Sequence, residues 1–112
     1  MSDDQSVIHK QVFDLGAEPG DLVQTFEVPR TAALVAVDWD TRSLFGIALW
    51  YRFRKSHDKY TGPEYTTTWR VLVRGTGHPF MADARHLATV VRDGFAWHLL
   101  DADGGHIQWA TR

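Results

Sequence analysis

The sequence contains no cysteine, and this absence removes three kinds of chemistry at once. Disulfide bonds, thiolate metal sites and cysteine nucleophiles are all excluded, and an oxidising extracellular location is unnecessary though not excluded. The first six residues, M-S-D-D-Q-S, are acidic and polar, unlike the basic start and apolar run of a signal peptide. No apolar run approaches the roughly 20 residues needed to span a bilayer. These absences predict a soluble protein that is made inside the cell.

An excess of charge of either sign is also lacking. The chain has 12 Lys and Arg against 14 Asp and Glu, and its pI is near 6.3. Such a balance gives no overall attraction to nucleic acid or to a membrane. No serine lies in a G-x-S-x-G context, and the aspartate pairs Asp38/Asp40 and Asp101/Asp103 occur in turns with no sign of burial. We therefore predict a protein that is not an enzyme and needs no cofactor.

What the sequence does contain is strand-like alternation interrupted by turn residues. In residues 65–74, Trp69, Val71 and Val73 share one face, whereas Arg70 and Arg74 share the other. About eight short strands are expected, at residues 7–13, 22–28, 33–39, 44–54, 65–74, 87–92, 94–101 and 106–110. This pattern predicts one all-β domain over residues 7–112, an antiparallel β-sandwich or small barrel, behind a disordered tail at residues 1–6.

Two of these strands are expected to form a long central hairpin. Residues 44–54 and 65–74 alternate most regularly, and the hydrophilic loop at residues 55–64 joins them. Two consecutive amphipathic strands separated by a polar loop are typical of an antiparallel hairpin. Elsewhere, Val35, Val37 and Trp39 are expected to face the core, and Asp93-Gly94 is expected to form a tight turn between the strands on either side of it.

The strand at residues 65–74 is followed by G-T-G-H-P at residues 75–79. Two glycines permit positive φ angles and the proline lacks a backbone donor, so a sharp turn is the simplest explanation. Consecutive backbone N–H groups in such a turn also suit an anion, which makes the turn a candidate ligand-binding site. The candidate residues are Gly75, Thr76, Gly77 and His78, with His98 as a neighbour.

Four histidines lie in or beside the expected strands: His9, His78, His86 and His98. Imidazoles that strands bring together can bind Zn²⁺. Their spacing, however, contains no H-x-H, H-x-x-x-H or H-E-x-x-H pattern. The sequence therefore does not favour a metal site.

Several short patterns occur in an order that resembles a known family. They are I-H-K at residues 8–10, A-x-L-V-x-V at residues 32–37, G-T-G-H-P at residues 75–79 and W-H-L at residues 97–99. Together they resemble a family of small phage and actinobacterial proteins of unknown function, with G-T-G-H-P as the most specific part. The chain departs from the family pattern at Gln11, Arg30-Thr31 and Phe45-Gly46. The resemblance implies a phage origin and a location in the host cytoplasm or a virion, and it supplies no catalytic residues.

The first functional hypothesis is a non-enzymatic protein that binds a macromolecular partner through the exposed face of the hairpin, as a homo-oligomer. Aromatic and arginine side chains dominate interface hot spots. The candidate anchors are Trp50, Arg52, Tyr60 and Arg70. With the implied phage origin, the partner is a host protein or a virion component. Small-ligand binding at the turn of residues 75–78 is the second hypothesis. Nucleic-acid binding through basic residues of the hairpin is a third and less favoured one.

Overall fold

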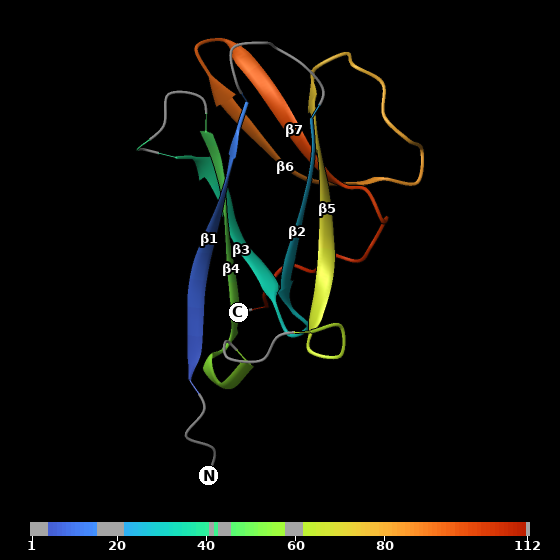
Figure 1. The fold of residues 1–112 in the computed structure, drawn as a ribbon. Helices are drawn as coiled ribbons and strands as arrows, with labels where there is room; N and C mark the ends of the chain where they lie inside the picture. The colour runs from blue at the N-terminus through green and yellow to red at the C-terminus, as the bar shows by residue number, and fades with distance from the viewer. Residues whose placement is uncertain (1–4, 16–21, 41, 43–45, 58–61, 112) are drawn as a thin grey trace.

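The computed structural model describes residues 5–15, 22–40, 42, 46–57 and 62–111, and these residues form an all-β fold (Figure 1). The first four residues of the predicted tail lie outside this description, and the first strand begins at Ser6. The elements are β1 (Ser6–Asp14), β2 (Leu22–Pro29), β3 (Ala33–Trp39), β4 (Gly46–Arg54), a 3₁₀ turn (Lys55–His57), β5 (Thr66–Gly75), β6 (Arg85–Arg92) and β7 (Phe95–Asp101). Within the described chain, no helix has the length and apolar character needed to cross a membrane.

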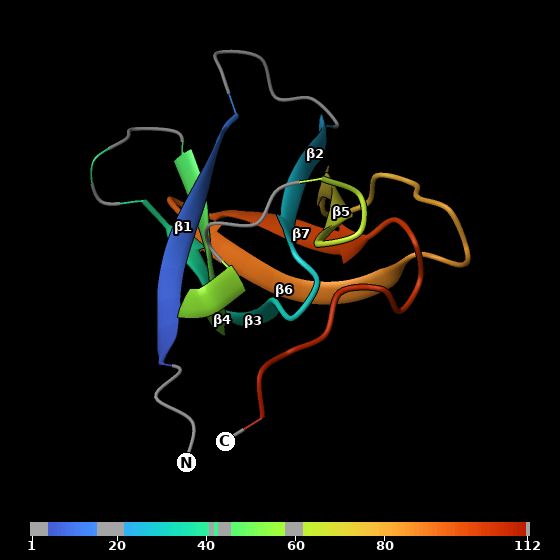
Figure 2. The ribbon, with the colours of Figure 1, turned by 60° about the horizontal axis from the view of Figure 1, so that its bottom comes forward.

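The strands divide into two sheets that pack face to face (Figure 2). One sheet has three strands in the order β1-β4-β3, and the other has four in the order β2-β5-β7-β6. Every pairing between these strands is antiparallel. The prediction of an all-β, antiparallel sandwich is therefore confirmed, and the two sheets formed by the described strands are open rather than closed into a barrel.

The core lies between the sheets and is built largely from β4 and β5. Leu49 of β4 and Val71 and Val73 of β5 have no exposed surface, because alternate residues of each strand face inward. Trp69 is 1% exposed, and its ring meets that of Tyr51 edge-on across the sandwich, with 5.7 Å between ring centroids. Buried aromatic side chains of this size contribute heavily to the free energy of folding. The predicted inward face of β5 is thus confirmed.

The predicted central hairpin is wrong, because β4 and β5 lie in different sheets. β4 pairs with β1 and β3, whereas β5 pairs with β2 and β7. The core faces of β4 and β5 consequently meet across the sandwich instead of lying side by side. The apolar face of each strand is thus covered by the inner face of the opposite sheet. The long polar loop between them does not impose a hairpin register, as a two-residue turn would.

A β-bulge in β3 reverses part of the expected alternation. The register with β4 shifts between Leu34 and Ala36. Leu34 is therefore fully buried, whereas Val35 is 38% exposed instead of facing the core. Beyond the bulge, Val37 and Trp39 pack against the core as predicted.

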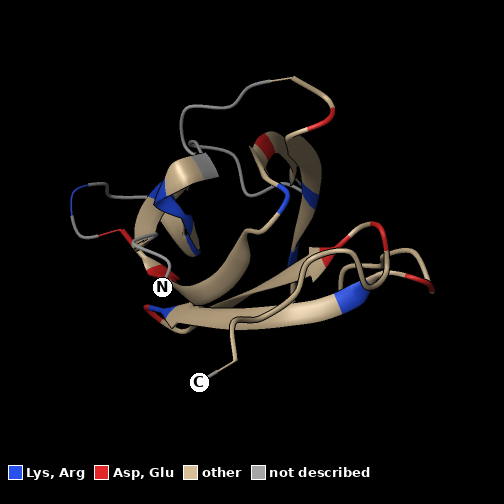
Figure 3. Cartoon of the chain, turned by 90° about the horizontal axis from the view of Figure 1, so that it is seen from below, with Lys and Arg blue, Asp and Glu red and all other residues tan. Residues whose placement is uncertain are grey.

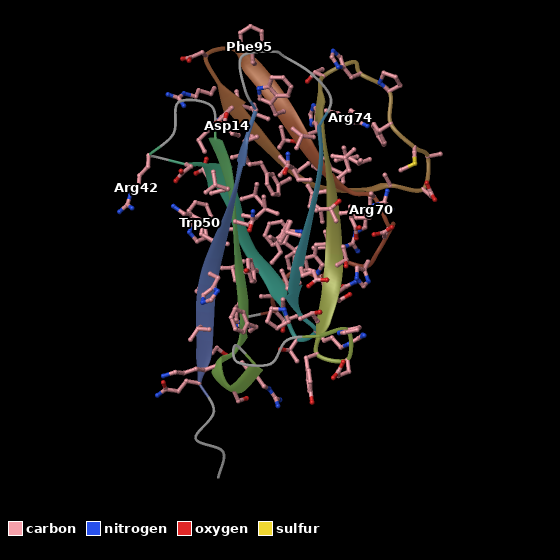
Figure 4. The ribbon with its side chains drawn as sticks, viewed as in Figure 1. Asp14, Arg42, Trp50, Arg70, Arg74 and Phe95 are labelled. Carbon is pink, nitrogen blue, oxygen red and sulfur yellow. The ribbon has the colours of Figure 1, made fainter. Side chains whose placement is uncertain are left out.

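The tight turn between β6 and β7 is confirmed. Asp93 and Gly94 have φ angles of 52° and 82°, and positive φ at both central positions is what a type I′ hairpin turn requires. Phe95 follows the turn at one end of the sandwich and is 69% exposed (Figure 4).

Residues 108–110 run along the β3 edge of the three-stranded sheet. They form an isolated bridge there instead of the eighth strand that was predicted at residues 106–110. Leu34 and Trp109 form an isolated parallel bridge. Leu34 N–H donates to the Gln108 carbonyl (2.8 Å), and Ala110 N–H donates to the Leu34 carbonyl (2.7 Å). This segment therefore covers one edge of β3, which limits pairing of that edge with other chains.

Two aspartates that the sequence places in turns are buried, which corrects the expectation of unburied turn carboxylates. Asp101 has no exposed surface, and its carboxylate accepts hydrogen bonds from the backbone N–H groups of Ile107 (2.7 Å) and Asp103 (2.9 Å). Asp40 is 7% exposed and pairs with Lys10 at 3.1 Å. Because both carboxylates have structural partners, their burial is explained by the fold.

Candidate ligand-binding site

A pocket of about 200 Å³ lies at the end of β5, on the outer face of the four-stranded sheet. The segment that joins β5 to β6 contributes to its wall, and it is the yellow-to-orange loop beside β5 in Figure 1. A dry protein cavity of about 150 Å³ holds a benzene molecule, so this pocket has room for a small ligand. Its lining residues are Arg74, Gly75, Gly77, His78, Phe80, His86, His98 and Leu100.

The turn at residues 75–78 supplies one side of the pocket. His78 N–H donates to the Gly75 carbonyl at 3.1 Å, and Gly77 has a φ of 88°, a conformation that glycine adopts readily. A Cβ atom at Gly75 would lie 3.7 Å from both His78 Nε2 and the ring of Trp97. The predicted turn is therefore confirmed. Because the His78 amide donates within the turn, it is not available to a ligand in the pocket.

The strand register brings distant parts of the sequence to this pocket. His98 of β7 lies opposite Arg74 of β5 on one side and opposite Thr89 of β6 on the other. A bulge between His86 and Ala88 then places His86 on the same face as Thr89, three residues along the chain. Simple alternation does not bring these two side chains together. His86 is therefore a pocket residue that was not among the predicted ligand-binding residues.

A continuous chain of hydrogen bonds connects two of the imidazoles. Thr76 Oγ1 lies 2.8 Å from His98 Nε2, and His98 Nδ1 lies 2.9 Å from Thr89 Oγ1. Thr89 Oγ1 is in turn 2.8 Å from Nε2 of His86. The ring centroids of His86 and His98 are 5.9 Å apart. Both ring nitrogens of the half-buried His98 therefore have hydroxyl partners, which fix the plane of its ring against the pocket.

Arg74 joins the pocket to the loop that walls it. Its Nε donates to the Pro79 carbonyl (3.3 Å) and its Nη1 donates to the Val73 carbonyl (3.1 Å). These bonds hold a permanent positive charge at the pocket, since an arginine stays protonated. None of the described lining residues carries a carboxylate. The described lining therefore offers an arginine and several imidazoles to a ligand in this pocket.

The histidines of the pocket do not form a metal centre. Within the part of the chain that the structure describes, no three His, Cys, Asp or Glu side chains are grouped to hold a metal ion. A metal ligand needs a nitrogen lone pair directed at the ion, and both nitrogens of His98 point at threonine hydroxyls. His9 lies on β1, where its ring packs edge-on against Phe53 at 4.8 Å.

The residues predicted to anchor a partner do not form one surface. Trp50 and Arg52 lie on β4 in the three-stranded sheet, whereas Arg70 lies on β5 in the other sheet. Figure 4 shows Trp50 and Arg70 on opposite sides of the sandwich. Tyr60 lies outside the described residues. Because the outer faces of two packed sheets point in opposite directions, these residues do not share the hairpin face that was expected, and partner binding by them stays a prediction.

The basic residues considered for nucleic-acid binding are divided in the same way. Arg52 and Arg54 belong to β4, whereas Arg70 and Arg74 belong to β5, and Arg70 pairs with Asp103 at 3.0 Å. In Figure 3 the Lys and Arg positions occur as separate segments on several elements, with Asp and Glu between them. A nucleic-acid site usually presents a continuous basic stripe, which these described residues do not form.

The model of a family described as a domain of unknown function, DUF7352, matches residues 5–108. That range contains all seven described strands and every lining residue of the pocket. No curated protein and no solved structure matches the chain.

Proposed function

We propose that this chain, which belongs to the DUF7352 family, is a non-enzymatic binding domain that holds a small anionic ligand in the pocket at the end of β5. One observation carries the proposal: Arg74 and three histidines of the described lining converge on one pocket. Small-molecule sites are concave and largely apolar, with a few convergent polar groups. Phe80 and Leu100 supply the apolar wall of this pocket.

Exchange of Arg74 for glutamine tests the proposal. Sulfate and acetate serve as probe anions, and isothermal titration calorimetry together with amide chemical shifts of the ¹⁵N-labelled protein measures their binding. We expect Arg74→Gln to weaken sulfate binding by about tenfold or more, because a charge-assisted hydrogen bond contributes about 1.5–3 kcal/mol.

Arg70→Gln is the matched control for this experiment. Arg70 lies on the same strand and face, but it pairs with Asp103 and does not line the pocket. Equal weakening by the two substitutions, or no binding of either anion to the wild-type protein, would contradict the proposal. Phe80→Ala keeps the charge and removes part of the wall, and we expect it to weaken acetate binding several-fold through lost apolar contact.

We also propose a second candidate function, in which the outer face of the three-stranded sheet contacts a second copy of the chain. The observation that favours it is apolar exposure: Ile8 is 57% exposed, and Ile8 and Arg52 are cross-strand partners on the same face as Trp50. Aromatic and arginine side chains beside exposed apolar ones are frequent in protein interfaces. The family resemblance supports a phage origin, with a host or virion protein as a further partner and the host cytoplasm or virion as the location.

Trp50→Ala tests the second candidate. Size-exclusion chromatography with light scattering across a range of concentrations measures the molecular mass of wild type and variant. We expect the wild type to form a dimer or larger oligomer. In the variant, the dissociation constant of that oligomer should rise at least tenfold, as expected when a hot-spot residue is removed, so that more of the protein is monomeric. Phe95→Ala, at an exposed site at the tip of the β6–β7 hairpin, should leave the mass unchanged. A wild type that is monomeric at all concentrations contradicts this candidate.

A further inference from the structure

We infer that the free edge of β1 pairs with β1 of a second copy, so that two three-stranded sheets continue as one antiparallel sheet across a two-fold axis. β1 is the outer strand of its sheet and lies at one margin of the molecule (Figure 1). Within the part of the chain that the structure describes, β4 is the only strand that pairs with it. The inference goes beyond both proposed functions, because backbone pairing at this edge uses neither the pocket nor the outer face of the sheet.

The register shows which backbone groups of β1 reach that free edge. The Lys55 N–H donates to the Gln5 carbonyl at 2.6 Å, in the same register as the ladder between β1 and β4. In an antiparallel ladder, hydrogen-bonded pairs alternate with pairs that are not bonded. The odd-numbered residues of β1 therefore bond to β4, and the even-numbered residues direct their N–H and C=O groups outward. The outward-directed residues include Ile8, Lys10 and Val12.

The other edges of the sandwich carry features that deter pairing with another chain. Residues 108–110 bond to the outer side of β3. β6 contains a bulge, and the Trp39 indole N–H donates to the Val91 carbonyl at 3.1 Å. β2 ends in Pro29, which has no N–H to donate. β1, by contrast, keeps an unbroken register over 9 residues and contains no proline. Because bulges, prolines and covering segments are the usual protection of edge strands, β1 is the least protected of these edges.

One residue of β1, Lys10, would normally protect the edge, because a lysine on an edge strand repels an approaching copy. Here its Nζ pairs with Asp40 Oδ1 at 3.1 Å, and the Asp40 side chain is only 8% exposed. Asp40 directly follows β3, on the far side of β4 from β1, and its N–H donates to the Gly46 carbonyl. The ion pair therefore draws the Lys10 side chain across the outer face of β4 and away from the free edge. A charge that could block pairing is held out of the interface.

The sequence of β1 is complementary to itself when two copies run antiparallel about Lys10. Ile8, which is 57% exposed in the single copy, then lies opposite Val12 of the second copy on the outer face. Val7 lies opposite Phe13 on the inner face. Both are apolar pairs of the kind that stabilises neighbouring strands. A shift of two residues in either direction places Ile8 opposite a charged residue, and a shift of one turns buried side chains outward. The edge is thus isologous, as a two-fold dimer requires.

Because the chain has no cysteine, introduced cysteines can test this register directly. Opposed residues of a hydrogen-bonded pair have Cα atoms about 5.5 Å apart, a separation that suits a disulfide bond. We expect Ile8→Cys/Val12→Cys to form a disulfide-linked dimer under mild oxidation, whereas Ile8→Cys alone stays unlinked. Non-reducing electrophoresis measures the product. Absence of cross-linking in the paired variant, or equal cross-linking in the single variant, overturns the inference.

Proline substitutions test the same edge without a cross-link. Ile8→Pro removes an edge-directed N–H and no bond to β4, and we expect it to raise the dissociation constant of the dimer by about tenfold or more. Val23→Pro is the matched control on β2, the edge strand of the other sheet, where Val23 is 51% exposed. The Arg30 N–H donates to the Tyr65 carbonyl in the register of β2, so the Val23 N–H also points to a free edge. This control should leave the dissociation constant unchanged. Analytical ultracentrifugation measures the constants, and circular dichroism confirms folding.

Asp40→Asn tests the role of the ion pair. It frees the Lys10 ammonium to extend toward the edge, so we expect it to weaken the dimer several-fold, whereas Asp40→Asn/Lys10→Gln should restore the dimer. A weakening that the second change does not reverse contradicts the role given to Lys10. A dimer that Ile8→Pro leaves intact and Trp50→Ala abolishes overturns this inference and supports the outer-face contact. A wild type that is monomeric at every concentration overturns both.

Discussion

Replacement of Asp101 by alanine is expected to lower the free energy of unfolding by about 3–5 kcal/mol, among the largest losses from a single side chain in this protein. The carboxylate has no exposed surface and accepts hydrogen bonds from the amides of Ile107 and Asp103. Its removal leaves both N–H groups without that acceptor, and each buried, unsatisfied donor costs about 1–3 kcal/mol. Urea denaturation followed by circular dichroism measures the loss.

The effect of Asp101→Ala should extend to the segment that the carboxylate holds. Ile107 is fully buried, and the residues after it bond to Leu34 of β3. We therefore expect hydrogen exchange at the Ile107 and Ala110 amides to accelerate more than exchange in β4. Asp103→Ala is the matched control, because that side chain is 36% exposed and pairs with an exposed arginine. A loss above about 1 kcal/mol in the control, or equal losses in the two variants, would refute this account.

Replacement of Trp69 by alanine is expected to cost about 3–5 kcal/mol of unfolding free energy, the range for truncation of a buried aromatic residue. Trp69 is 1% exposed and touches rings from both sheets, with centroid distances of 5.7 Å to Tyr51 and 5.9 Å to Phe26. Its loss therefore opens a cavity at the centre of the sandwich. Urea denaturation followed by circular dichroism avoids the change in tryptophan fluorescence that the substitution itself causes.

Trp109→Ala is the matched control for the core substitution. Trp109 is 41% exposed, and the hydrogen bonds on either side of it involve backbone atoms of Gln108 and Ala110, which the substitution keeps. We expect a loss of about 1 kcal/mol or less. A Trp69→Ala variant as stable as Trp109→Ala would mean that the two sheets do not pack on each other through this ring.

The candidate ligand-binding site was partly predictable from sequence because its parts are local. The turn at residues 75–78 follows from two glycines and a proline beside a regular strand, and His98 lies in another regular strand. The other contributors depend on pairing between strands. His86 and Thr89 share a face with His98 only because a bulge lies between His86 and Ala88, and no periodicity in the sequence signals that bulge.

The sequence by itself determined the all-β class and the inward faces of the regular strands, because a side-chain period of two is a local property of an extended chain. It also determined the turn at residues 75–78 in which Gly77 adopts positive φ.

Only the tertiary structure decided that β4 and β5 belong to opposite sheets, that Asp101 is buried, and that Arg74, His86 and His98 meet at one pocket. The physical reason is that strand pairing is a choice among non-local partners. The pairing that forms is the one that buries the apolar faces and satisfies the buried polar groups of the whole domain. No single stretch of the sequence determines either quantity.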